Sequence, residues 1–214
     1  GTPGIVELQS GNTYSGGTVV TNRGVLFLAS DGLGAVPASP DASNLYVNNG
    51  VLRCGNANFE LDANRGVTVG SLGMELHPWG SFSMVINGNL SGDGAITVTD
   101  GGIVRFGGAA NAYNGSLSIN GGCNIGIGNG ANFSWASTGG IIDNGTLHLK
   151  TDGVSTFSDT VSGSGVVRKE GSGALTLNTP ASYAGTTYVD AGLLRVAATN
   201  VLPSGSAKGI VEIA

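Results

Sequence analysis

Apolar and polar residues alternate along many short stretches of this chain. Clear examples are residues 95–99, 116–119, 146–149 and 174–177. Because successive side chains of a strand point to opposite faces, this period of two predicts half-buried β-strands. The pattern shows no helical periodicity, so we expect an all-β protein.

Turn-forming pairs separate these stretches. They are Asn49-Gly50, Asn87-Gly88, Asp93-Gly94, Gly101-Gly102, Gly121-Gly122 and Asn144-Gly145. Because Asn, Asp and Gly tolerate positive φ, we expect a sharp corner at each pair. Such corners suit a coil, but they also suit the antiparallel hairpins of a sandwich or jelly roll.

A repeated phrase favours the coil. Tyrosine, any residue and glycine precede a β-like run in residues 12–20, 111–117 and 181–189, and residues 22–26 resemble residues 190–194. Internal repetition without helical periodicity is typical of solenoids and propellers. The three tyrosines are 99 and 70 positions apart, which suits a coil of roughly 20–25 residues better than propeller blades of about 40–50. We therefore expect one β-solenoid domain over residues 1–214, a parallel β-helix of about nine or ten rungs.

The repeated phrase also supplies candidate corner residues. These are Tyr14, Gly16, Tyr113, Gly115, Tyr183 and Gly185. We expect each tyrosine ring to pack against its corner and to leave the hydroxyl in water, because tyrosine has an apolar body and a polar tip.

Composition agrees with this fold and excludes others. Glycine contributes 39 of 214 residues and charged residues only 11%, which disfavours surface helices. The hydrophobic fraction of 40% argues against disorder. Collagen is excluded, because glycine does not recur at every third position and proline contributes 6 residues.

Charge and hydropathy narrow the function. The net charge is −5 and Arg168-Lys169 is the one adjacent basic pair, so we expect no nucleic-acid partner. No apolar run approaches the roughly 20 residues that span a bilayer, so we expect no membrane span.

The chain shows no pattern typical of a metal or cofactor site. Cys54 and Cys123 lie 69 positions apart and have no metal-ligand spacing. A disulfide between them remains open, but two small buried residues are the simpler interpretation. We expect no metal and no cofactor.

Catalytic patterns are also weak, and we expect no enzyme. The 14 acidic residues are scattered. Glu60 and Asp62 share one strand face, where they could bind calcium, act as an acid pair or simply be exposed. A polysaccharide-cleaving β-helix remains the alternative, and it would need acids and aromatics converging near Trp79 or Trp135.

One aromatic stretch, residues 74–79, falls outside the repeats. It contains His77 and Trp79, and it could leave the coil to meet a partner or cap the core locally. His148 lies between Leu147 and Leu149, so we expect it to point outward. Neither histidine belongs to a nucleophile-containing triad.

Residues 156–177 and 183–194, together with residues 8–28, resemble the passenger-associated transport repeat, also called the autotransporter-associated β-strand repeat. This resemblance implies a right-handed β-helix that is secreted or displayed on the bacterial surface. It also implies a stalk, an adhesin passenger that binds surface glycans, or a segment of a large exoprotein.

The two ends of the sequence echo each other. Residues 4–8 read Gly-Ile-Val-Glu-Leu and residues 209–213 read Gly-Ile-Val-Glu-Ile. An uncapped solenoid presents unpaired backbone at its ends, so we expect stacking with another copy or with adjoining solenoid segments. The candidate stacking residues are Ile5, Val6, Leu8, Ile210, Val211 and Ile213. The function expected is an extracellular structural stalk or self-stacking filament.

Overall fold

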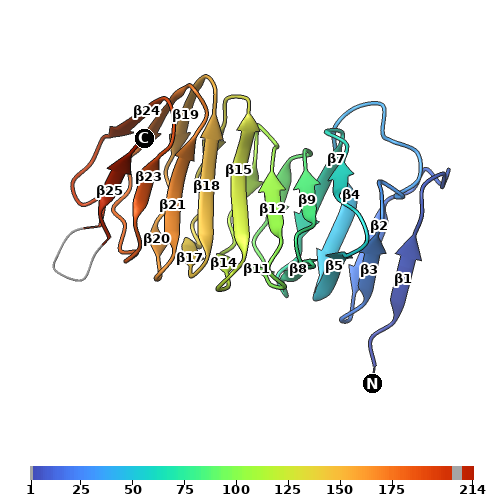
Figure 1. Ribbon diagram of the computed structural model, residues 1–214. Helices are drawn as coiled ribbons and strands as arrows, with labels where there is room; N and C mark the ends of the chain where they lie inside the picture. Colours follow the sequence, from blue (N-terminus) through green and yellow to red (C-terminus); the bar gives the residue numbers. More distant parts are fainter. Residues whose placement is uncertain (1, 204–208) are drawn as a thin grey trace.

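The chain winds into an elongated β-solenoid. A computed structural model describes residues 2–203 and 209–214. Strand β1 (Ile5–Leu8) lies at one end, and β24 (Leu193–Val196) and β25 (Val211–Ile213) lie at the other (Figure 1). The described residues form strands, turns and bends without a helix. Strands of successive coils pair in parallel, which confirms the predicted solenoid and excludes the antiparallel sandwich.

Each full coil visits three faces in turn. Face 1 is an eight-stranded sheet. Its strands are β1 (Ile5–Leu8), β3 (Val25–Leu28), β5 (Gly50–Cys54), β8 (Met74–Pro78), β11 (Ile96–Val98), β14 (Leu117–Ile119), β17 (Ile141–Asp143) and β20 (Val161–Ser162).

Face 2 is also an eight-stranded sheet. Its strands are β6 (Phe59–Leu61), β9 (Ser83–Ile86), β12 (Ile103–Phe106), β15 (Asn124–Gly130), β18 (Thr146–Thr151), β21 (Val166–Glu170), β23 (Thr187–Val189) and β25 (Val211–Ile213).

Face 3 consists of two sheets, of five and four strands. The first contains β2 (Thr18–Thr21), β4 (Asp41–Asn48), β7 (Arg65–Val69), β10 (Leu90–Gly92) and β13 (Ala112–Tyr113). The second contains β16 (Ser134–Trp135), β19 (Val154–Phe157), β22 (Ala174–Leu177) and β24 (Leu193–Val196). The ladder breaks between β13 and β16, which are not paired.

The coil length agrees with the sequence prediction. Partners in neighbouring coils are 19 positions apart at the short extreme, Thr176 with Arg195, and 27 at the long extreme, Thr18 with Leu45. The nine strands of face 3 correspond to about nine coils. The four stretches predicted from alternation coincide with β11, β14, β18 and β22.

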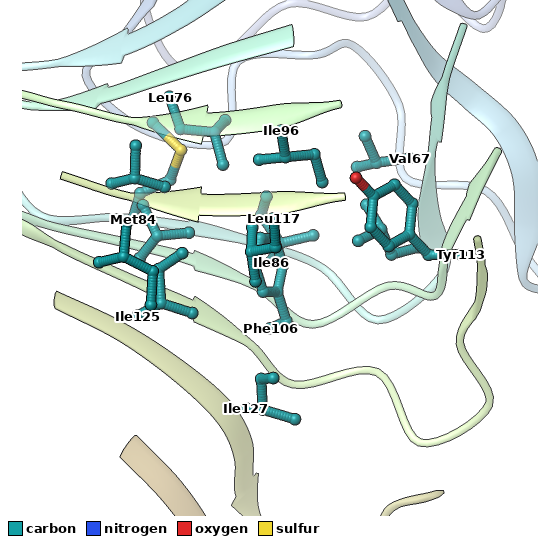
Figure 2. Close-up of a cluster of buried hydrophobic side chains, with 14 of the residues drawn as sticks. Val67, Leu76, Met84, Ile86, Ile96, Phe106, Tyr113, Leu117, Ile125 and Ile127 are labelled. Carbon is teal, nitrogen blue, oxygen red and sulfur yellow. The ribbon is translucent and has the colours of Figure 1, made fainter. Parts of the chain in front are cut away.

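Inward-pointing side chains of all three faces form one continuous core. Figure 2 shows a section of it, in which Leu76 and Ile96 of face 1 lie near Met84 and Ile86 of face 2 and Val67 of face 3. Burying each such side chain stabilises the fold by about 1.5–3 kcal/mol. Because the core is built from stacked layers, every coil depends on its neighbours to exclude water.

The corners only partly follow the predicted backbone geometry. Asn49, Gly101 and Gly122 adopt positive φ, as expected. Gly88, Gly94 and Gly145 do not. At those three positions a β-carbon would collide with a backbone carbonyl oxygen of the preceding coil, so the requirement for glycine is one of space.

Candidate interaction surfaces

The repeated tyrosines lie inside the coil and not on its surface. Tyr113 and Tyr183 are buried, and the hydroxyl of Tyr113 lies 2.8 Å from the carbonyl oxygen of Gly94. The Tyr183 hydroxyl pairs with the Thr187 hydroxyl at 2.5 Å. The expectation of a solvent-exposed hydroxyl was therefore wrong for both. Burial raises the pKa of each phenol, so both stay neutral hydrogen-bonding groups.

Tyr14 is the exception because it lies in the first coil. Its side chain is 39% exposed, although its hydroxyl makes the equivalent contact, 2.9 Å from the Thr18 hydroxyl. The glycine of the first repeat also differs from those of the other two repeats in the space around it. A β-carbon on Gly115 or Gly185 would meet the preceding coil, whereas one on Gly16 would meet nothing within 4 Å.

Both ends of the solenoid expose residues that belong to the core. Val6 and Leu8 of β1 pair in register with the buried Leu26 and Leu28. Beside them, the first coil opens into a hollow of about 490 Å³, which Tyr14 also lines.

The far end repeats this arrangement. Val211 and Ile213 of β25 pair with the buried Thr187 and Val189, yet Ile213 is 78% exposed. These side chains are exposed because no further coil covers them among the described residues. Ile5 and Ile210 are exposed as well.

The echoed end sequences do not occupy equivalent places. Residues 5–8 form β1 of face 1, whereas residues 211–213 form β25 of face 2. The similarity of the two sequences therefore does not align one end strand above the other.

A separate hollow of about 380 Å³ lies on the outside of face 1. Its walls come from β3, β5, β8 and β11 and their corners, and they include Arg23, Arg53, Glu75 and His77. Arg53 and His77 are partners in neighbouring strands, which places them side by side on the outer surface. Sequence reasoning identified His77 but missed Arg53 and Glu75. Arg53, Glu75 and His77 all occupy outward positions of residues 50–54 and 74–78, and the register of these two strands brings them together.

Trp79 lies beside this hollow. Residues 74–78 form β8, so this stretch stays within the coil and does not leave it as a loop. Trp79 is 55% exposed, whereas Met74, Leu76 and Pro78 of the same stretch are buried. The guanidinium of Arg53 lies over the indole ring, 5.2 Å from its centroid.

His77 is held between two carboxylates. Its Nε2 lies 3.0 Å from Glu75 and its Nδ1 lies 3.1 Å from Asp100. The Trp79 backbone N–H donates to Cys54 in the preceding coil, and that of Gly80 donates to Asp100 in the following one. Backbone hydrogen bonds to the preceding and following coils therefore hold Trp79 and Gly80, next to His77, in place.

Four further residues that the sequence analysis considered, Trp135, His148, Glu60 and Asp62, lie away from this hollow. Trp135 is buried and its indole N–H donates to Asp159 at 3.2 Å. His148 points outward on face 2, where its Nδ1 lies 2.6 Å from Glu170. Glu60 and Asp62 share the outer surface as expected, and Glu60 accepts a hydrogen bond from Asn87 at 2.6 Å.

The sequence did not predict the burial of four ionisable side chains, which are Arg65, Asp143, Asp159 and Lys169. Arg65 is buried and pairs with Asp31 at 2.8 Å. Lys169 is buried and donates to three backbone carbonyls, including that of Ala191 at 3.0 Å, while burial lowers its pKa. Burial raises the pKa of Asp143 to about 7.

The cysteines are free and buried, which agrees with the interpretation of two small core residues. Burial raises the pKa of Cys54 to about 11, so its thiol stays protonated. Within residues 2–203 and 209–214, no three His, Cys, Asp or Glu side chains cluster as metal ligands do. Nor does that part of the chain contain a helix with the length and apolar character needed to cross a bilayer.

Comparison with known proteins confirms the resemblance seen in the sequence. Residues 3–26, 96–122 and 167–196 match the family described as Passenger-associated-transport-repeat. Each matched segment contains one copy of the tyrosine–glycine phrase.

A relative from Escherichia coli (strain K12), named "Uncharacterized lipoprotein YdeK", is 30% identical over 139 residues. The alignment covers 64% of this chain and 10% of that protein, so the chain spans about one tenth of its relative's length. No solved structure matches the chain.

Proposed function

From three copies of the passenger-associated-transport repeat and a core open at both ends, we propose that this chain is a structural segment of a β-solenoid rod on the bacterial surface. Its open ends bind further coils, either of an adjoining solenoid segment or of a second copy. The repeat and the lipoprotein relative support a place in the cell envelope or at the cell surface.

The observation that carries this proposal is the exposure of core positions at the ends. Val6 at one end and Val211 and Ile213 at the other face inward in register, yet water reaches them. Apolar side chains in such positions favour burial against another layer. The unpaired edges of β1 and β25 would provide the backbone hydrogen bonds for that layer.

Sedimentation velocity of the purified chain over a range of concentrations tests the proposal. We expect association at high concentration, and we expect Val211→Lys with Ile213→Lys to prevent it, because lysine at an edge resists strand addition. Ile142→Lys is the matched control. Ile142 is an exposed apolar residue on the flank of β17, so its replacement should leave association intact. A wild-type chain that stays monomeric, or equal loss in the Ile142 variant, would contradict end-to-end binding.

A further inference from the structure

We infer that the hollow on face 1 beside Trp79 is a binding site for an acidic saccharide, one that carries a carboxylate or a sulfate. Nothing in the rod function requires this site. It lies on the flank of the solenoid, and the stacking residues lie at the ends.

The first argument is that two arginines at the hollow lack a carboxylate partner among the described residues. In the part of the chain that the structure describes, the Arg53 side chain contacts the Trp79 ring and no carboxylate, and its Nε is buried without a hydrogen-bond partner. Arg23 lines the same hollow, and its guanidinium likewise has no acceptor among the described residues. A guanidinium presents a planar set of donors that suits carboxylate and sulfate oxygens.

A second arginine–aromatic pair on the same molecule provides a contrast. Arg168 lies over the Tyr188 ring, 4.5 Å from its centroid, but Asp190 accepts two hydrogen bonds from it at 2.8 and 2.9 Å. The guanidinium of Arg168 therefore already has a carboxylate partner. Among the described residues Arg53 has no corresponding carboxylate, and it faces an open hollow instead.

The second argument is the shape and chemistry of the surroundings. Trp79 borders the hollow through Arg53, whose guanidinium lies over its ring, and the exposed part of that ring offers apolar atoms against which a sugar ring can pack. Glu75 in the wall is a hydrogen-bond acceptor that suits sugar hydroxyls. A concave site with a few fixed polar groups and an aromatic ring at its border is a usual form of a small-ligand site.

The third argument is preorganisation. Backbone hydrogen bonds fix Trp79 and Gly80 to the coils on both sides, and Glu75 and Asp100 fix His77. A ligand would therefore find the walls of the hollow already in place. This lowers the ordering cost of binding.

Tryptophan fluorescence provides a direct test. Trp79 is exposed and Trp135 is buried, so a ligand in the hollow should change the emission of Trp79. We would titrate the full chain with trigalacturonate, with a sialylated and a sulfated oligosaccharide, and with the neutral counterpart of each. We expect saturable binding of at least one acidic probe over its neutral counterpart, weakened by added salt. The carboxylated and sulfated probes distinguish the two acidic groups.

Variants locate the site. Arg53→Gln should weaken binding by about tenfold or more, since it removes a charge-assisted contact. Trp79→Ala should abolish it when binding is measured by calorimetry. Arg195→Gln is the control, because Arg195 is exposed on β24, far along the chain from the hollow, and should change nothing. Equal binding of acidic and neutral probes, no binding of any probe, or equal losses in the Arg53 and Arg195 variants would each overturn the inference.

Discussion

At two of the three repeated phrases, glycine faces the backbone of another glycine one coil away. Gly115 lies against the carbonyl oxygen of Gly94, and Gly185 lies against that of Gly165. Neither adopts positive φ. Close approach between coils therefore requires glycine here, and this requirement helps to explain why glycine is so abundant.

Alanine variants of these glycines test whether steric contact between coils, and not backbone conformation, is the reason for glycine. We expect Gly115→Ala and Gly185→Ala to lower the free energy of unfolding by about 1–3 kcal/mol, because the added methyl group collides with the coil beneath. Gly16→Ala, at the same place in the first repeat, should change it by less than about 0.5 kcal/mol, since its surroundings are open. Urea denaturation measures all three variants. A comparable loss in the Gly16 variant would argue against the steric explanation.

Asp143 gives the stability of the fold a pH dependence. Burial raises its pKa to about 7, whereas an unfolded aspartate titrates near pH 4. Between these values the folded state holds a proton that the unfolded state has lost. The free energy of unfolding should therefore fall as the pH rises from about 4 to about 7, by an amount on the order of 3 kcal/mol.

Asp143→Asn should flatten this slope, because the amide does not titrate and still offers an oxygen to the Gly145 N–H. Thermal unfolding measured across the interval tests it. Asp159, whose pKa burial also raises, contributes in the same direction and leaves a residual slope. An unchanged slope in the Asp143 variant would refute this assignment.

At the scale of elements, Arg65 of β7 fixes the long connection between β3 and β4. Its guanidinium pairs with Asp31 and donates to the carbonyls of Leu33 at 2.9 Å and Gly34 at 2.7 Å. The connection, residues 29–40, has no strand of its own. Arg65 thus makes the largest set of side-chain hydrogen bonds to a connection that lacks a strand, and Asn12 and Asn64 add one each, to Gly32 and Pro37.

Arg65→Ala should cost about 3–5 kcal/mol, because it leaves Asp31 and several carbonyls without their buried partner. Hydrogen exchange should show that residues 29–40 lose protection first. Arg195→Ala removes an exposed arginine and serves as the comparison. Exchange that rises uniformly over all coils would contradict a local role for Arg65.

Sequence alone predicted the strands and missed these contacts for one physical reason. Alternation in β11, β14, β18 and β22 is a local property of a few residues, so it is readable without a structure. The pairing of Arg65 with Asp31 spans 34 positions, and that of Arg53 with Trp79 spans 26. Such contacts depend on the length of each coil, which varies between 19 and 27 residues. His77 and Trp79 were identified as a patch, but the hollow beside them emerges only when the register is known.

At the scale of the whole molecule, coils contact mainly their neighbours, so a complete coil should be removable. Deletion of residues 104–124 would join Ile103 to Ile125, which occupies the place of Val104 in the next coil. We expect this variant to fold with a reduced melting temperature, because nearest-neighbour contacts are restored across the junction.

Deletion of residues 104–113 alone is the matched comparison. It removes about half a coil and would place residues 114–116 and the face 1 strand β14 where face 2 residues belong. Circular dichroism and thermal melting should show a folded first variant and a disrupted second one. Equal disruption in both would mean that stability is not distributed coil by coil.

The break between β13 and β16 bears on how the rod would respond to mechanical load. Backbone hydrogen bonds between coils run along the long axis, so tension applied to the two ends loads the junctions in series. Most junctions in the middle of the rod are paired on three faces, but this one is paired only on faces 1 and 2 among the described residues. Among the junctions in the middle of the rod, this one should therefore separate first under pulling force, while the coils on either side of it stay paired.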